Sequence, residues 1–431
     1  MRLIQSQPHH WQAVRTLCLM LPVIFLLQVA SAEEMTPLTL SDAEQLALGN
    51  DPVIAANIAR SEALDADAVA DAQLPDPKFR TGLYNVPLDD FDLQRVPTTQ
   101  LRLGVQQRFP RGNTLEYKSL KTQAEAQTAR RKAVLEQQKI LRDVRKTYLD
   151  TYYQVEVAHI IRSSRQLFES LTEITEAQYA SGGSSQQDVL RAELELLRLD
   201  DRITQVQAKE DAARARLSRW LGQAAWQPLA ATLPEMPEPP DDKQIIDQLE
   251  QHPEIRLQAA KIETHQQAVA IAKEQYKPGW TVGAEYRKRF GDNPDGSDRA
   301  DMAAVMLAVD LPFFTEKRQD QRLKASQKRA AAASLDRANS RRTLRERLAR
   351  DKANRQRLSE RLQRYEDRLL KEAEENANAA LQAYQSGTTD FTALMRARIT
   401  ELDIHVQALK LRVDLLKTKA NLLYLAAGDK Q

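Results

Sequence analysis

The side chains that most often carry out chemistry are sparse in this sequence. Its only cysteine is Cys18. Of its six histidines, His9 and His10 lie near the start of the chain, and the others are scattered singly at His159, His252, His265 and His405. Metal sites generally need two or more ligands on one helix face or loop. The sequence also lacks a phosphate loop, a nucleophile elbow and a paired His–Glu zinc motif. We therefore expect a protein that is not an enzyme and holds no cofactor and no metal.

The first 32 residues have the pattern of an export signal. Arg2 and Arg15 precede an apolar run over residues 17–29, which ends at the small-residue cleavage pattern Ala30-Ser31-Ala32. The run is shorter than the roughly 20 apolar residues of a membrane helix, although an uncleaved anchor is an alternative. Of 62 basic and 60 acidic residues, Arg2 and Arg15 would leave with the signal. The balanced charge that remains does not favour nucleic acid as a partner.

The rest of the chain is a duplication, which sets its architecture. Pairs of similar motifs recur in the same order at offsets that grow from 201 to 206 residues: Asn50-Asp51-Pro52 with Gln251-His252-Pro253, Pro77 with Pro278, Phe109-Pro110 with Leu311-Pro312, Tyr179 to Gly182 with Tyr384 to Gly387, and Gly222 with Gly428. We expect a first repeat over 33–222, a proline-rich linker over 223–241 and a second repeat over 242–428.

Each repeat contains one unusually long helix. Neither glycine nor proline occurs between Gly112 and Gly182 or between Pro312 and Gly387, and both runs are rich in good helix formers. They predict long helices over 113–181 and 315–385, each roughly 100 Å long at 1.5 Å per residue. Shorter helices are expected over 41–74, 184–221, 242–276 and 388–427, with 184–221 and 388–427 as the return helices. A coiled-coil scaffold is the alternative interpretation of these helices.

A β-hairpin is expected ahead of each long helix, at about 79–109 and 279–312. Period-two alternation of apolar and polar residues predicts strands over 79–86, 100–106, 280–287 and 305–311. Such alternation fits a membrane β-barrel, with lipid outside and water inside, or a small soluble sheet packed on helices. Four strands leave two open edges, which lipid does not tolerate, and barrels begin at about eight strands. We therefore expect a homotrimer with twelve strands.

These motifs resemble the TolC-type outer-membrane efflux proteins over residues 36–428. The resemblance rests on LTLSDAEQLALGNDP at 38–52, on the two hairpins, and on YASGGSSQQDVLRAELE at 179–195 with its counterpart YQSGTTDFTALMRARI at 384–399. It implies a mainly α-helical chain with a membrane β-barrel, in which three copies form a twelve-stranded barrel continued by an α-helical periplasmic tunnel. It also implies outer-membrane lipid, a periplasmic adaptor (membrane fusion protein) and an inner-membrane resistance-nodulation-division transporter as partners.

The turns between the long and return helices are the expected periplasmic tip. The resemblance implies that this tip gates the channel and docks the adaptor, and it draws attention to ten residues: Tyr179, Gly182, Gly183, Asp188, Arg191, Tyr384, Gly387, Thr389, Asp390 and Arg396. Tyr384 and Asp188 take the places of the family archetype's constricting pair, whereas its partner arginine is Thr389 here and its two lumen aspartates are Ala393 and Arg396. If Arg191 and Arg396 faced the lumen, a trimer would place six arginines at the entrance; a solvated or salt-bridged helix face is the alternative for both.

The cargo is the least defined part of the prediction. Residues 73–112 resemble the branch that serves heavy-metal pumps for copper and silver, or for cobalt, zinc and cadmium. We therefore expect an exit channel in the outer membrane of a Gram-negative bacterium that conducts substrate passively, with heavy-metal cations as the first expectation. Multidrug efflux, a type I secretion duct and a periplasmic coiled-coil scaffold are the alternatives.

Overall fold

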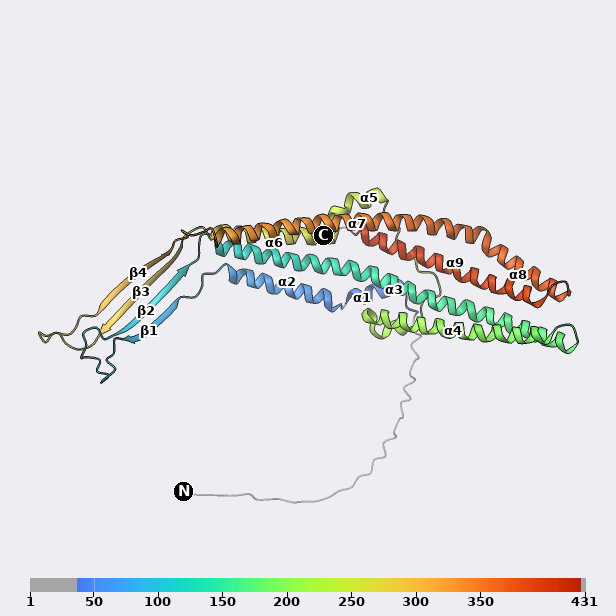
Figure 1. Ribbon diagram of the computed structural model, residues 1–431, viewed down its shortest axis with the longest axis horizontal. Coiled ribbons are helices and arrows are strands. Elements are labelled where there is room, and N and C mark those ends of the chain that lie inside the picture. The colour runs from blue at the N-terminus through green and yellow to red at the C-terminus, as the bar shows by residue number, and fades with distance from the viewer. Residues whose placement is uncertain (1–36, 50, 428–431) are drawn as a thin grey trace, which may run out of the picture. The chain divides into compact units, whose positions relative to one another are not determined.

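The computed structural model describes residues 37–49 and 51–427, so the expected signal over 1–32 and its cleavage near Ala32 lie outside the described residues. All of the described residues belong to one compact unit that begins at Pro37. Its elements (Figure 1) are α1 (Leu40–Gly49), α2 (Pro52–Asp71), β1 (Lys78–Tyr84), β2 (Gln100–Phe109), α3 (Thr114–Ala180), α4 (Gln186–Leu221), the 3-10 segment η1 (Gly222–Trp226), α5 (Asp242–Gln248), the 3-10 segment η2 (Leu249–Gln251), α6 (Pro253–Glu274), β3 (Gly279–Arg289), β4 (Met302–Asp310), α7 (Gln319–Arg364), the π segment η3 (Tyr365–Leu369), α8 (Leu370–Gln385) and α9 (Phe391–Leu425).

The four strands form one antiparallel sheet in the order β1-β2-β3-β4. Each repeat contributes one hairpin, and the two hairpins join through β2 and β3, where Leu103 pairs with Tyr286 and Phe109 with Trp280. The expected strands are present, with ends shifted by up to three residues. Among the described strands, β1 and β4 have a partner on one side only, so the sheet has two open edges.

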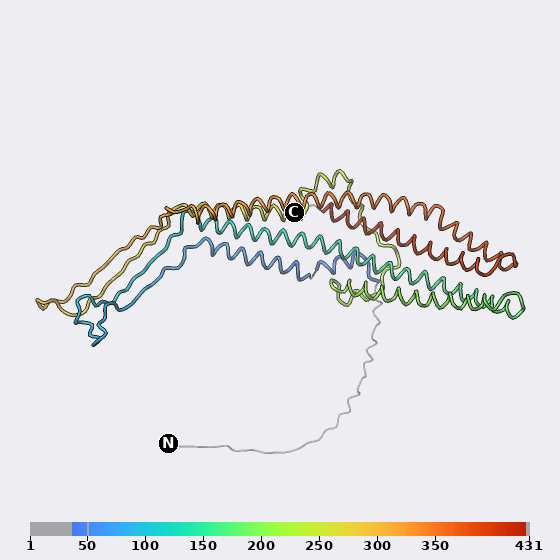
Figure 2. Tube along the Cα trace, viewed as in Figure 1, coloured from blue at the N-terminus to red at the C-terminus, as the bar shows by residue number. Residues whose placement is uncertain are grey.

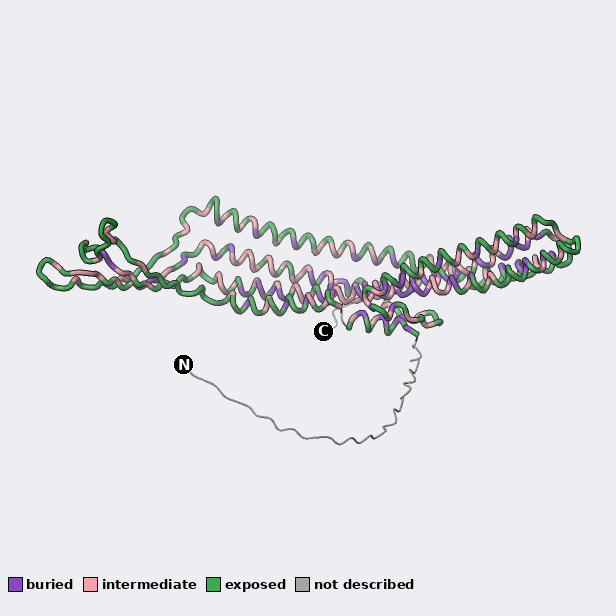
Figure 3. Tube along the Cα trace, turned by 90° about the horizontal axis from the view of Figure 1, so that it is seen from below, coloured by how far each residue is buried: buried purple, intermediate pink, exposed green. Residues whose placement is uncertain are grey.

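Four helices continue the sheet in the same order. Contacts join α2 to α3, α3 to α6 and α6 to α7. The helix next to each strand in the sequence (α2 for β1, α3 for β2, α6 for β3 and α7 for β4) therefore has the same place in the helical layer as its strand has in the sheet. Beyond this layer α3 extends to its turn with α4, beside which the α8–α9 pair lies (Figure 2). Buried residues are concentrated along these helices, whereas most strand residues are exposed (Figure 3).

The first shorter helix of each repeat is broken, which corrects the expectation of single helices over 41–74 and 242–276. Asp51 caps the start of α2 by accepting hydrogen bonds from the backbone N–H groups of Val53 (2.8 Å) and Ile54 (3.2 Å), and Pro52 takes the first helical position. Capping side chains followed by proline start helices because they satisfy free N–H groups and preset φ. His252 and Pro253 do the same at the start of α6.

The second long helix is also less regular than expected. It begins at Gln319 rather than at residue 315, and a π segment, η3, separates α7 from α8. The first long helix, α3, is continuous over 67 residues. An extra residue in a π turn rotates the helix that follows it. The side chains of α8 therefore point in different directions, relative to α7, from those that they would have in an unbroken helix.

The proline-rich linker is held against α3 and α4. Tyr152 on α3 donates its hydroxyl group to the carbonyl of Ala231 (3.3 Å). Tyr148 donates to the carbonyl of Leu38 (2.8 Å), and the Leu38 N–H in turn donates to the linker carbonyl of Pro228 (2.8 Å). The buried Arg214 of α4 donates to the carbonyls of Ala225 and Gln227, both at 2.9 Å. These bonds satisfy polar groups that burial would otherwise leave unpaired, and they fix the linker midway along the helices.

Candidate functional site

The sheet has one apolar face, on which large side chains lie in the open. The pairing register places Phe79, Val105, Ala284 and Val305 in one row across all four strands. Exposure reaches 81% at Val305 and 66% at Phe79, far more than a soluble sheet leaves on its apolar side. The face also contains Leu83, Leu101, Leu103, Phe109, Trp280, Val282, Tyr286, Leu307 and Val309.

The opposite face of the sheet is charged. Arg102 of β2 pairs across the strands with Arg287 of β3, and Glu285 lies between them, 2.5 Å from the Arg287 guanidinium and 3.9 Å from that of Arg102. The Arg102 guanidinium also lies 4.0 Å above the Tyr84 ring. Gly82, Gly104 and Gly283 pair across the strands with Arg102, Arg80 and Gln106 and leave room beside the long side chains. A sheet with lipid on one side and water on the other needs this distribution.

The loops at the far end of the sheet are acidic. Between β1 and β2, Arg95 forms ion pairs with Asp89 (2.5 Å) and Asp90 (2.7 Å). Between β3 and β4, Asp301 accepts from Tyr286 and from the backbone N–H of Arg289 at 3.2 Å. The paired arginine holds the pKa of Asp89 below its ordinary value. The Asp89 carboxylate therefore stays ionised at neutral pH and keeps its loop hydrated.

The α3–α4 turn places four of the expected tip residues. Gly182 has φ +83°, a left-handed conformation that glycine adopts without strain, and Gly183 donates its N–H to the carbonyl of Gln178 at 2.7 Å. Asp188 and Ser185 form a capping box at the start of α4. Tyr179, one turn before the glycines, is 49% exposed.

The α8–α9 turn repeats this design at an offset of 205 residues. Gly387 has φ +72°, and Thr388 donates its N–H to the carbonyl of Ala383 at 2.9 Å. Asp390 caps α9 by accepting from the backbone N–H of Ala393 at 2.8 Å. Thr389, between the turn and the cap, is partly buried. The two turns therefore end the two helical hairpins with the same local structure.

Tyr384 points into its own chain, unlike its repeat counterpart Tyr179. It is 7% exposed, its hydroxyl lies 3.4 Å from that of Thr175, and its ring meets Phe391 edge-on at 5.6 Å. Asp188 is used in the capping box, and no hydrogen bond joins it to Tyr384 in the described part of the chain. The structure thus does not bring this pair together within one chain.

The two tip arginines have different surroundings. Arg191 of α4 donates to the Thr392 hydroxyl of α9 and so connects the two repeats. Arg396 is exposed, and its side chain has no ion pair among the described residues. Sequence reasoning missed Arg398, which is buried between Glu401 (2.8 Å) and Asn378 (3.0 Å). The Arg398–Glu401 spacing of three residues was the one available signal.

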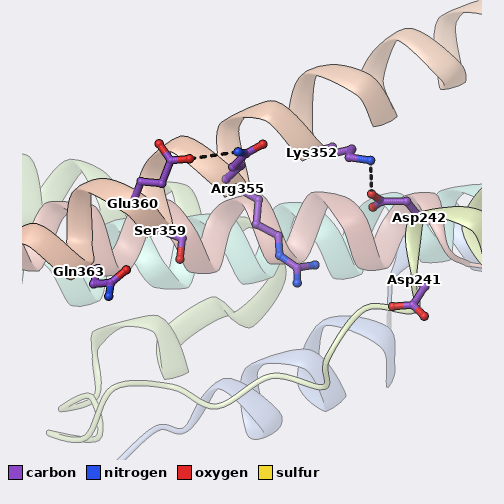
Figure 4. A pocket seen from close by; sticks show the side chains of 8 residues that line it. Asp241, Asp242, Lys352, Arg355, Ser359, Glu360 and Gln363 are labelled. Atoms are coloured by element: carbon purple, nitrogen blue, oxygen red, sulfur yellow. Dashed lines mark hydrogen bonds and ion pairs between the residues drawn. The ribbon is translucent and has the colours of Figure 1, made fainter.

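A polar cleft of about 390 Å³ lies where α7 passes the start of α5. Lys352 pairs with Asp242 at 2.7 Å, while Arg355 extends toward the linker beside Asp241 (Figure 4). Gln356 donates to Glu360 at 3.0 Å. The Lys352–Asp242 pair holds the start of α5, directly after the linker, against α7, which is the behaviour of a structural junction.

Two features are absent from the described residues. No group of three or more His, Cys, Asp or Glu side chains there is arranged to hold a metal ion. None of the helices in that part of the chain combines the length and apolar character of a membrane span.

Comparison with known proteins connects this geometry to a family. Residues 245–428 match the family model described as Outer membrane efflux protein. No curated protein matches the chain in sequence. The family consists of passive outer-membrane channels, so the prediction that the chain is not an enzyme is confirmed.

Solved structures of outer-membrane proteins share the fold over nearly the whole chain. VceC from Vibrio cholerae is 18% identical with a TM-score of 0.75, covering 91% of this chain and 97% of its own. CusC is 14% identical with a TM-score of 0.77, covering 91% and 93%. MtrE from Neisseria gonorrhoeae, solved in an open state, is 14% identical with a TM-score of 0.73, covering 90% and 89%. The expectation of a mainly helical chain with a TolC-like channel fold is confirmed.

Proposed function

We propose that the whole chain is an outer membrane efflux protein, the exit channel of a three-part efflux system. The observation that carries the proposal is the two-faced sheet with open edges, continued by helices in the same order. Three copies would join β4 of one sheet to β1 of the next, giving twelve strands and removing every open edge, as lipid requires. The apolar face would contact lipid and the charged face would line the lumen.

The helical turns would form the periplasmic tip. Tyr179, Gly182, Gly183, Gly387 and Asp390 are exposed there and would meet a periplasmic adaptor, which couples the channel to an inner-membrane resistance-nodulation-division transporter. A gate built on Tyr384 and Asp188 is not favoured, because both side chains are occupied within the chain. Arg396 is the better candidate for contact with a neighbouring copy, since it is exposed and has no ion-pair partner among the described residues.

Heavy-metal ions and organic compounds are the two competing proposals for the cargo. The resemblance of residues 73–112 to the heavy-metal branch supports the first. The match of residues 245–428 to the outer membrane efflux protein model, whose description names no cargo, supports a general efflux channel equally well. Multidrug efflux is therefore the second candidate, and a type I secretion duct is the third.

Growth of a deletion strain tests the proposal directly. The strain is compared with its complemented parent on copper, silver, zinc, cobalt and cadmium salts, and on dyes, bile salts and antibiotics. Sensitivity to one or two metals would support a metal exit channel, and sensitivity to many organic compounds would support multidrug efflux. Wild-type growth on every compound would contradict an efflux role.

A further inference from the structure

The face of the sheet opposite the apolar side chains has a strong excess of positive charge. By strand register it contains six cationic residues and two carboxylates. The cations are Lys78, Arg80, Arg102, Arg108, Arg287 and Arg289, and the carboxylates are Glu285 and Asp310. Each chain therefore has a net charge of +4 on this face.

The carboxylates neutralise only part of this charge. Glu285 is shared by Arg102 and Arg287. Asp310 lies 3.9 Å from Arg111, which is in the loop between β2 and α3. Lys78, Arg80 and Arg108 are exposed and have no ion pair among the described residues. Their charge is thus available to a solute.

A groove at the helix-side end of the sheet brings Lys78 and Arg108 together with Arg111. It has a volume of about 360 Å³ and is lined by Lys78, Arg108 and Arg111, with Asp76 as its one carboxylate. Gln106, Thr114 and Gln275 add neutral polar groups. Cationic and amide groups that converge on a concave surface favour a negatively charged solute.

We propose that the pore selects anions, and that the cargo class is solutes carrying net negative charge. The inference rests on the proposed function, since a sheet that turns its apolar face to lipid must turn this cationic face to the lumen. A charged lining with low-dielectric walls focuses the field and raises the local concentration of the opposite charge. Three chains would supply twelve net positive charges inside one barrel, and a free metal cation would be the disfavoured passenger.

The acidic loops favour cations rather than anions, but they lie outside the strands. Residues 85–99 and 290–301 contain seven aspartates and two arginines, and they connect the strands at the end of the sheet away from the helices (Figure 1). Solvated charges there are screened over about 8 Å at physiological salt. A solute in the lumen must pass within this distance of the charges on the sheet. The sheet therefore sets the sign of the selectivity.

Reversal potentials in planar bilayers test the proposal. The purified, assembled protein is inserted in neutral lipid across a tenfold KCl gradient, and the ratio of chloride to potassium permeability is measured. Wild type is expected to prefer chloride. Arg80→Glu with Arg108→Glu should lower the ratio several-fold. Arg80→Gln with Arg108→Gln, which replaces that variant if the reversed charges prevent folding, should lower the ratio by a smaller factor.

The matched control changes the same amount of charge elsewhere. Lys209→Glu with Arg216→Glu alters two exposed cations of α4, which has no ion pair with the sheet in the described part of the chain. This control should keep the wild-type ratio. Neutralising Asp89 and Asp295 in the loops should increase the preference for chloride.

The outcomes separate this inference from the function on which it rests. Pores that prefer potassium, or that ignore both substitutions at Arg80 and Arg108, would overturn anion selectivity and leave the channel standing. An assembled protein that forms no pore would overturn the channel and the inference together.

Discussion

At the residue scale, the conformation of Tyr384 limits what this side chain can do. Its hydroxyl and ring contact Thr175 and Phe391 of the same chain, so it contributes to packing of the tip. The repeat counterpart Tyr179 lies in the same Tyr-x-Ser-Gly motif but is half exposed. A motif that recurs twice in a sequence thus places its tyrosine in two different environments.

Removal of the Tyr384 side chain should destabilise the tip. Tyr384→Ala is expected to lower the free energy of unfolding by about 3–5 kcal/mol, because it leaves a cavity against Phe391. Tyr384→Phe should cost less than about 1.5 kcal/mol, since it loses one long hydrogen bond. Thermal unfolding followed by circular dichroism measures both. Tyr179→Ala is the control. An equal loss of unfolding free energy in that variant would show that burial of the Tyr384 side chain does not explain its contribution to stability.

His252 should make the protein sensitive to mild acid. Burial lowers the pKa of its imidazole to about 4, from an ordinary value of 6.5. The Nδ1 atom accepts from the Glu254 N–H at 3.2 Å, so Nε2 donates to the Tyr424 carbonyl at 3.1 Å. Protonation would break the first of these bonds. The unfolded chain therefore binds the proton more readily than the folded chain between pH 6.5 and 4.

The stabilisation from neutral His252 is complete above pH 6.5 and is lost as the pH falls toward 4. It amounts to roughly 3 kcal/mol. Unfolding curves between pH 7.5 and 4 should show this loss in wild type and in His405→Asn, which alters an exposed histidine. His252→Asn keeps an acceptor for the cap and should flatten the dependence. An unchanged slope in His252→Asn would assign the acid sensitivity to other groups.

At the element scale, the strands were predictable and the helix breaks were partly missed. Alternation of apolar and polar residues identified all four strands because one face meets a different environment from the other. The break before α2 was missed, although Asp51-Pro52 is a typical helix start. The π segment at residues 365–369 was not predicted, because its sequence contains no glycine or proline to mark a break in the helix.

A single added charge should distinguish the two faces of the sheet. Val305 and Met306 are neighbours on β4, 81% and 50% exposed, and point to opposite faces. Val305→Arg would place a guanidinium in lipid at a cost of about 2–4 kcal/mol near the bilayer centre, whereas Met306→Arg would place it in the lumen. Carbonate-washed outer membranes should retain Met306→Arg and lose much of Val305→Arg. Equal retention of both variants would argue against a lipid-facing apolar face.

At the scale of the whole molecule, the repeat explains why the described sheet has two open edges. Each repeat supplies one hairpin and one long helix, and the hairpins join side by side through β2 and β3. The same arrangement leaves β1 and β4 with one neighbour each in the described chain. The duplication was evident from the sequence. The sequence did not show which strands and helices of the two repeats lie side by side, because that depends on contacts between residues some 200 positions apart.

The tip is the part of the site that the sequence described least well. Gly182 and Gly387 were correctly expected at turns, because only those positions interrupt long stretches of helix formers. The directions of Tyr384, Arg191 and Arg396 could not be predicted, since they depend on how α4, α8 and α9 pack. Their roles in gating and adaptor docking stay predictions.

The most direct test of the account is the native mass of the protein extracted from outer membranes in mild detergent. Closure of the sheet requires neighbours at both β1 and β4, so the account predicts a mass of three chains, with no free monomer after salt and carbonate washing. A folded monomer or dimer in the membrane extract would contradict the closed barrel and, with it, the channel.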